Sequence, residues 1–212
     1  MKPSQSHFHQ LRGLRHHVRA WGNPASPRLF LLHGWMDVSA SFQFLVDSLL
    51  REWHVLAPDW RGFGLSEWTR EEGYWFPDYY ADLEALLDHY QPSGPALLVG
   101  HSMGGVIASI YAGIRPDRVA RLVSMEGLGL ARHAPDQAPK RYAQWLDQLK
   151  DTPEFRPYRS FDEVAARLRK TNPRLSGEKA AFLARHWAKS LDSGEIVLLS
   201  DPRHKNINPY LF

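Results

Sequence analysis

A serine between two glycines is the first candidate for chemistry in this sequence. Ser102 lies at the centre of residues 100–104, which read GHSMG. The apolar residues 96–99 predict a buried strand, and the apolar spacing over 106–114 predicts a helix. A serine at such a strand-to-helix turn takes a strained backbone conformation, and its hydroxyl lies beside the N–H groups that begin the helix. This arrangement suits nucleophilic attack on a carbonyl group. The alternative is a glycine-rich corner with an incidental serine.

Other polar residues follow further predicted strands. Residues 33–35 (His-Gly-Trp) come directly after an apolar strand, and Asp59 opens a glycine-rich loop after the next one. Glu126 follows a strand that is predicted beyond the helix after Ser102. The carboxyl ends of parallel strands meet at one edge of a sheet. We therefore expect these residues to share one crevice with Ser102.

The order of predicted elements defines the architecture that must position these residues. Strands are predicted at 29–32, 55–58, 96–99 and 120–125, and they alternate with helices at 42–50, 77–90 and 106–114. This alternation predicts an α/β fold with a mostly parallel sheet and helices on both faces. Residues 8–21 are predicted to form two short strands that turn at Gly13. The histidines and arginines of this hairpin are interpreted as exposed, not as a metal or polyanion site.

From residue 131 onward the pattern changes. Helices are predicted at about 142–149, 160–170 and 176–191, capped by Ser160 and Ser176, with no strands between them. We therefore predict two parts, an α/β core over 1–130 and a helical lid over 131–212. Five aromatic residues of the lid are expected to cover an apolar pocket: Trp145, Phe155, Tyr158, Phe182 and Trp187.

Composition limits the classes of function. The 212 residues include no cysteine, which excludes disulfides, thiol catalysis and cysteine-ligated metal sites and favours a cytoplasmic location. No secretory signal and no membrane-spanning apolar run is visible. The net charge of +3 comes from interspersed acids and bases, so nucleic acid is not an expected partner. No cofactor or metal is expected, and the oligomeric state is not predicted.

Three motifs together resemble those of the α/β-hydrolase family, over essentially residues 12–212. They are the stretch 100–105, the pair His33-Gly34, and residues 58–66, which are similar to the family's D-x-R-G-x-G-x-S loop. The resemblance implies that Ser102 attacks a carbonyl carbon and that the backbone N–H groups of Trp35 and Met103 form the oxyanion hole. A serine at this position argues against epoxide hydrolase and haloalkane dehalogenase chemistry. The resemblance also implies that six further residues line the pocket or support the site: His33, Gly34, Asp59, Gly100, His101 and Gly104.

The resemblance leaves the rest of a catalytic triad open. Glu126 is predicted as the acid, because some dehalogenase-like relatives place their acid at this strand end; the alternative is a partly exposed glutamate. The family's histidine follows the last strand. This chain is expected to be truncated at its C-terminus, so that the last strands and that histidine are missing. His101 is expected to point away from a base's position, and three histidines are predicted at the surface: His133, His186 and His204.

The sequence thus predicts a serine hydrolase for a small-molecule substrate with an apolar part. Its reacting group is an ester, a thioester, an amide or a carbon–carbon bond next to a ketone. A catalytically silent binding module on the same fold is the alternative from another class. A third reading is a cofactor-free perhydrolase or haloperoxidase, which uses the same serine chemistry.

Overall fold

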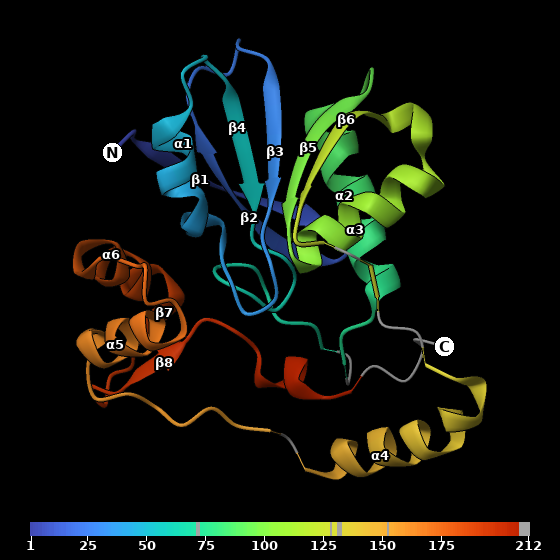
Figure 1. Cartoon of the computed structure of the whole chain (residues 1–212), viewed down its shortest axis with the longest axis vertical. Coiled ribbons are helices and arrows are strands. Elements are labelled where there is room, and N and C mark those ends of the chain that lie inside the picture. The colour runs from blue at the N-terminus through green and yellow to red at the C-terminus, as the bar shows by residue number, and fades with distance from the viewer. Residues whose placement is uncertain (71–72, 128, 131–132, 152, 208–212) are drawn as a thin grey trace.

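A six-stranded sheet forms the centre of the computed structural model, which describes residues 1–70, 73–127, 129–130, 133–151 and 153–207. In chain order its strands are β1 (Ser4–Leu11), β2 (Leu14–Trp21), β3 (Arg28–Leu32), β4 (His54–Pro58), β5 (Ala96–His101) and β6 (Val119–Met125). They lie side by side in the order β1-β2-β4-β3-β5-β6 (Figure 1). β2 is antiparallel to β1 and to β4, and the other neighbours are parallel, which confirms the mostly parallel sheet.

Helices cover both faces of the sheet, as predicted. α1 (Gln43–Ser48) packs on one face, and α2 (Phe76–Tyr90) and α3 (Met103–Ile114) pack on the other (Figure 1). The side chains of β3 alternate between two cores. Leu29 and Leu31 join the core beneath α1, and Phe30 and Leu32 join the core beneath α2 and α3. Residues 29–32 of β3 are buried on both faces of the sheet and are all apolar, whereas Arg28 at its start is exposed.

The helix that the sequence predicts over 42–50 is shorter in the structure. A 3-10 turn over Ser39–Phe42 precedes α1, and α1 ends at Ser48. Leu45 and Leu50 are exposed, so the predicted buried stripe is wrong at both positions. A helix of six residues makes fewer than two turns and cannot bury a stripe of that length.

The interpretation of the N-terminal hairpin as exposed is wrong for the two histidines of β2, whereas Arg12 and Arg15 are exposed as expected. β1 and β2 are joined at Arg12 and Gly13, whose φ angles are 49° and 79°. β2 then pairs with β4 and lies inside the sheet. Two of its histidines are therefore buried, with exposed fractions of 3% for His16 and 0% for His17. The buried ring of His17 has hydrogen-bond partners in Asp59 and Ser6, which allow a polar residue of β2 to lie inside the sheet.

The described residues between 133 and 207, called the inserted segment below, form a second layer beside the carboxyl ends of the parallel strands (Figure 1). It contains α4 (Ala138–Lys150), α5 (Phe161–Thr171), α6 (Gly177–Trp187) and an antiparallel hairpin of β7 (Ala188–Ser190) and β8 (Ile196–Leu198). The prediction of helices without strands is wrong, because the residues after Trp187 pair as this hairpin instead of extending α6. Ser160 and Ser176 cap α5 and α6, as predicted. The division into core and lid, and the expectation of missing strands, stay predictions.

Side chains of the inserted segment contact the sheet layer at separate points. The ring of Phe182 in α6 lies 5.4 Å from that of Phe44 in α1. The Trp187 indole N–H donates a hydrogen bond to the Ser41 hydroxyl at 3.1 Å. Beyond these contacts α5, α6 and the hairpin enclose a small apolar core of their own.

Candidate active site

Ser102 occupies the turn between β5 and α3, and its backbone is strained. Its φ of 50° and ψ of −117° lie in a region that non-glycine residues rarely adopt. The Ser102 N–H donates to the Met125 carbonyl oxygen at 2.8 Å, and the Ser102 carbonyl oxygen accepts from the Val106 N–H at 3.0 Å. The predicted strand-to-helix turn is therefore present, and both β6 and α3 hold it in this conformation.

The glycines around Ser102 are required by close backbone contacts. A Cβ atom at Gly100 would lie 2.5 Å from the Gly104 carbonyl oxygen. A Cβ atom at Gly104 would lie 2.2 Å from the Leu32 carbonyl oxygen at the end of β3. Carbon and oxygen atoms that are not bonded cannot approach so closely. Glycine is therefore the residue that fits at both positions.

Release of the strain at Ser102 predicts a stabilising substitution. A serine held at positive φ costs on the order of 1–3 kcal/mol, and glycine adopts this conformation without that cost. After the unfolded-state entropy of glycine is deducted, we expect Ser102→Gly to raise the free energy of unfolding by about 1 kcal/mol. The control is Ser109→Gly, within α3, which should lower it by about 0.5 kcal/mol. Urea denaturation measures both, and a less stable Ser102→Gly would contradict the strain.

The loop after β3 passes directly beside Ser102. A Cβ atom at Gly34 would lie 3.2 Å from the Ser102 Cβ atom. The buried His33 holds this loop, because its Nδ1–H donates to the Gly34 carbonyl oxygen at 2.8 Å and its Nε2 accepts from the Trp60 N–H at 2.9 Å. Burial lowers the pKa of His33, so the ring is neutral. Both ring nitrogens of His33 are thus engaged in supporting the loop.

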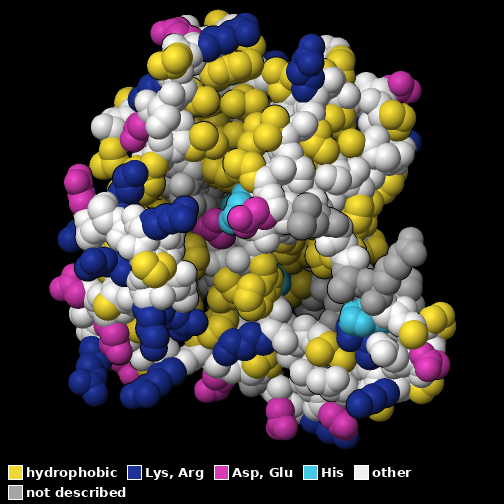
Figure 2. Space-filling model, viewed as in Figure 1, with side chains coloured by type: hydrophobic (Ala, Val, Ile, Leu, Met, Phe, Trp, Pro, Cys, Tyr) yellow, Lys and Arg dark blue, Asp and Glu magenta, His cyan; other side chains and the backbone are white. Residues whose placement is uncertain are grey.

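Trp35 and Met103 line the same cavity. These are the two residues whose N–H groups are predicted to hold an oxyanion, and the cavity has a volume of about 90 Å³. Much of its remaining wall is aromatic and comes from residues 73–79 and from Trp145 in α4, whose ring lies 5.7 Å from that of Trp75. Figure 2 shows hydrophobic side chains gathered around the hollow between the sheet and the inserted segment.

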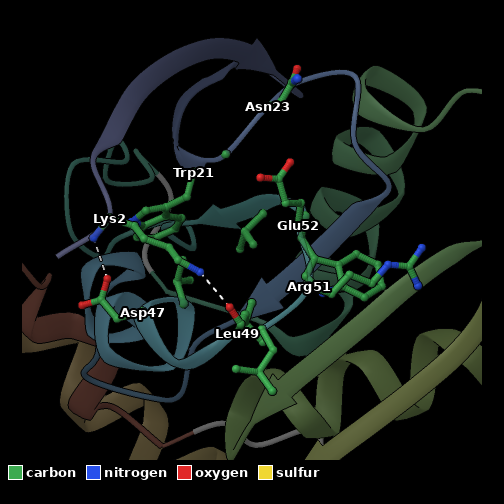
Figure 3. A pocket seen from close by; sticks show the side chains of 12 residues that line it. Lys2, Trp21, Asn23, Asp47, Leu49, Arg51 and Glu52 are labelled. Atoms are coloured by element: carbon green, nitrogen blue, oxygen red, sulfur yellow. Dashed lines mark hydrogen bonds between the residues drawn. The ribbon is translucent and has the colours of Figure 1, made fainter.

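A larger cavity, of about 500 Å³, lies at the opposite end of the sheet (Figure 3). Part of its wall comes from residues 22–23 and 49–53, which precede β3 and β4. Lys2 also lines this cavity, and its Nζ already donates a hydrogen bond to the Leu49 carbonyl oxygen at 2.8 Å. Ligands of parallel sheets bind at the carboxyl ends of the strands. Volume alone therefore does not make this cavity the candidate active site.

Asp59 anchors its loop and does not face the crevice. Its side chain is 2% exposed, and its oxygens accept hydrogen bonds from the Ser39 N–H at 2.6 Å, the Leu65 N–H at 2.9 Å and His17 Nδ1 at 2.7 Å. Burial acts to raise the pKa of Asp59, but the hydrogen bonds from His17 and the Leu65 N–H and the electrostatic interactions with His17 and His33 outweigh it and lower the pKa to about 2. The expectation that Asp59 shares the crevice is wrong, because both oxygens are engaged within the protein.

This carboxylate makes stability depend on acid pH. Because the pKa of Asp59 is about 2 in the folded protein and its ordinary value is 3.8, it stabilises the fold above about pH 4 and loses this contribution as the pH falls toward 2. Between about pH 5 and about pH 2, we expect the wild type to lose about 2 kcal/mol more unfolding free energy than Asp59→Asn. Urea denaturation at both pH values measures the difference, and the exposed Asp192→Asn is the control. An equal pH dependence in wild type and Asp59→Asn would show that Asp59 does not carry it.

A buried ion pair, which was not predicted from the sequence, fixes the loop after β4 to α2. Arg61 donates to both carboxylate oxygens of Asp82, at 2.5 and 2.6 Å, and Arg12 donates to Asp82 at 2.9 Å. The available signal was the acidic residue Asp82 on the apolar face of the helix, next to Leu83. A charge at such a position requires a buried partner.

Glu126 lies at the end of β6, where its backbone φ is 59°. Its side chain is 85% exposed, and one carboxylate oxygen lies 3.8 Å from His101 Nε2. Water surrounds a carboxylate that is so exposed and weakens its interaction with the imidazole. The structure thus brings Glu126 together with His101, and the predicted role of Glu126 as the acid stays a prediction.

A family model described as alpha/beta hydrolase fold matches residues 27–200 of the chain. The match includes the loop after β3, the turn at Ser102 and most of the inserted segment. The chain belongs to the alpha/beta hydrolase fold family.

Curated relatives of this alpha/beta hydrolase include the serine hydrolase-like protein of Danio rerio, which is 29% identical over 196 residues, or 87% of this chain and 57% of the relative. The cis-3-alkyl-4-alkyloxetan-2-one decarboxylase of Shewanella oneidensis is 30% identical over 207 residues, or 92% of this chain and 62% of the relative. The chain thus spans about 57–62% of the length of these two relatives. Among solved structures, the thioesterase domain from the curacin biosynthetic pathway is similar with a TM-score of 0.87 at 25% identity, covering 96% of this chain and 72% of that one.

The sequence predicts His204 of this alpha/beta hydrolase at the surface, but other side chains cover its ring. Its ring is stacked between those of Phe63 and Tyr74, at centroid distances of 3.8 and 3.7 Å. Burial lowers the pKa of His204 to about 3, so the ring is neutral. His204 also lines the cavity that contains Trp35 and Met103. His204 lies in a 3-10 turn over Pro202–Lys205.

The other histidines of the inserted segment do not line that cavity. His186 is half-buried, and burial lowers its pKa. His133 is partly exposed. In the described ranges, no group of three or more histidine, aspartate or glutamate side chains is placed to hold a metal ion. The helices described there do not combine the length and the apolar character needed to cross a membrane.

Proposed function

We propose that this chain carries the nucleophile and the oxyanion hole of a serine hydrolase that acts on an ester-like or other carbonyl substrate. In this proposal the Ser102 Oγ atom attacks the carbonyl carbon, while a base from outside the described residues accepts the hydroxyl proton and then passes it to the leaving group. The carbonyl oxygen becomes an oxyanion, which accepts hydrogen bonds from the N–H groups of Trp35 and Met103. Collapse of the tetrahedral intermediate restores the carbonyl group, expels the leaving group and leaves an acyl-serine, which water then hydrolyses.

The observation that carries the proposal is the strained backbone of Ser102 beside the loop that contains Gly34. Strain of this kind persists only where surrounding contacts enforce it, and it is common at functional sites. Here the contacts of Gly100 and Gly104 and the hydrogen bond to Met125 enforce it. A relaxed turn would join β5 to α3 without this cost, so the strain supports a role for the hydroxyl.

Other residues support the nucleophile in this proposal. Glu126 is proposed as the acid. None of the described residues is proposed as the base, because both ring nitrogens of His33 are engaged in hydrogen bonds and the ring of His204 is stacked between those of Phe63 and Tyr74. His33 and Asp59 would hold the loops around the site. The inserted segment is proposed to act as a lid over an apolar part of the substrate, since Trp145 contacts Trp75 at the cavity.

Covalent labelling tests this proposal. The protein, as its own cells make it, is treated with a fluorophosphonate probe, and its peptides are analysed by mass spectrometry. The proposal expects a phosphonyl group on Ser102 and none on Ser109, whose hydroxyl donates to the Gly105 carbonyl oxygen within α3. A protein with no label on Ser102 would overturn the proposal and favour the catalytically silent binding module.

A further inference from the structure

Trp35 also lines a second cavity, between the loop after β3 and the inserted segment. Its volume is about 150 Å³. Trp35, Met36, Phe155, Tyr158, Leu168 and Trp187 supply much of its wall, which is therefore largely apolar and aromatic. A cavity of about this volume with apolar walls is large enough to bind a benzene molecule. The space thus fits an apolar segment of about six carbon atoms.

The charged side chains that line this cavity, among the described residues, are both cations. Arg167 comes from α5, and Lys205 comes from the 3-10 turn over 202–205. Acidic side chains are common elsewhere on the inserted segment, so a cavity lined by cations without an acid is a local feature. Both cations lie at its solvent-exposed rim.

Neither cation is paired with a carboxylate in the described part of the chain. Arg167 donates to the Tyr158 hydroxyl, and its guanidinium lies 5.8 Å from the Tyr158 ring. Lys205 Nζ donates to the Glu154 backbone carbonyl oxygen at 3.1 Å and lies 4.1 Å from the Phe155 ring. A guanidinium has five N–H donors and an ammonium has three, so both cations keep donors for an anion.

We infer that this cavity binds a molecule with an apolar segment of about six carbon atoms that ends in a carboxylate. The apolar walls take the hydrocarbon, and the two cations at the rim pair with the anion. Because Trp35 also lines the cavity beside Met103, such a molecule lies next to the proposed oxyanion hole. Its identity as part of the substrate rests on the proposed function, whereas its binding does not.

The test is a titration of the Ser102→Ala protein with hexanoate and with its neutral counterpart hexanamide. Binding is followed through the indole N–H signals of Trp35 and Trp187 in nuclear magnetic resonance spectra. We expect hexanoate to bind about tenfold more tightly than hexanamide, because it adds charge-assisted hydrogen bonds. Arg167→Gln and Lys205→Gln should each remove most of this preference and leave the affinity for hexanamide unchanged.

Arg169→Gln is the matched control, because Arg169 lies on the same helix but does not line the cavity. It should leave the preference for hexanoate within about twofold of its original value, since a charge outside the cavity acts only through screened solvent. Equal affinities for hexanoate and hexanamide, or no saturable binding of either, would overturn the inference. An equal loss in Arg169→Gln would also overturn it. Because the titrated protein lacks the Ser102 hydroxyl, these outcomes are independent of whether Ser102 is labelled.

Discussion

Replacing Ser102 with alanine is expected to reduce kcat/KM for p-nitrophenyl acetate by at least about 10⁴-fold, because the acyl-serine can no longer form. The assay uses the protein as its own cells make it. The residual rate should come from binding and from the main-chain donors beside residue 102. The side chain itself is the only difference, since alanine can keep the same backbone turn.

Ser109→Ala is the matched control for this measurement. Ser109 lies on α3, the helix that Ser102 begins, and its hydroxyl is bonded to a helix carbonyl oxygen. Its substitution should change kcat/KM by less than about threefold, as expected for a residue that does not contact the substrate. Equal background rates in wild type and in Ser102→Ala would contradict the proposed chemistry and favour a binding module. Peracid formation that depends on Ser102 would instead favour the perhydrolase reading.

The second large effect is expected at Gly104. An alanine there places its Cβ atom 2.2 Å from the Leu32 carbonyl oxygen, and neither backbone segment can move without displacing α3 or β3. We expect Gly104→Ala to lower the free energy of unfolding by about 3 kcal/mol or more, as measured by urea denaturation. The tight turn at Ser102 depends on this contact, so labelling of Ser102 should be lost together with stability.

Gly113→Ala provides the opposite result within the same helix. A Cβ atom at Gly113 has no atom within 4 Å, and alanine favours the helix by roughly 0.5–1 kcal/mol over glycine. Gly113→Ala should therefore be slightly more stable than the wild type. Similar stabilities of the two variants would show that the close approach of α3 to β3 is not required by the fold.

The turn at Ser102 could be predicted because its requirements are local. A buried strand, a turn with small residues at positions 100, 102, 104 and 105, and an apolar helix follow one another in the sequence, and each restricts the next. The alternation of strands and helices similarly predicted the parallel sheet and the helices on its two faces. The structure shows why positions 100 and 104 are glycines, since a Cβ atom there would lie 2.5 and 2.2 Å from backbone carbonyl oxygens.

Contacts between distant elements could not be predicted in this way. The polar residues of β2 suggested that this strand is exposed. His17 is nevertheless buried, because it forms a hydrogen bond with Asp59, which lies far from it in the sequence. The ring of His204 is covered because Phe63 and Tyr74 stack against it from another segment. The β7–β8 hairpin consists of two three-residue strands, which are too short to produce a clear alternation of apolar residues.

A crystal structure of the protein after reaction with a fluorophosphonate tests the central claim most directly. The account predicts a bond between phosphorus and the Ser102 Oγ atom. It also predicts a phosphoryl oxygen about 2.7–3.1 Å from the backbone nitrogens of both Trp35 and Met103. A phosphoryl oxygen turned toward solvent and away from both nitrogens, or a phosphorus atom attached to another side chain, would contradict it.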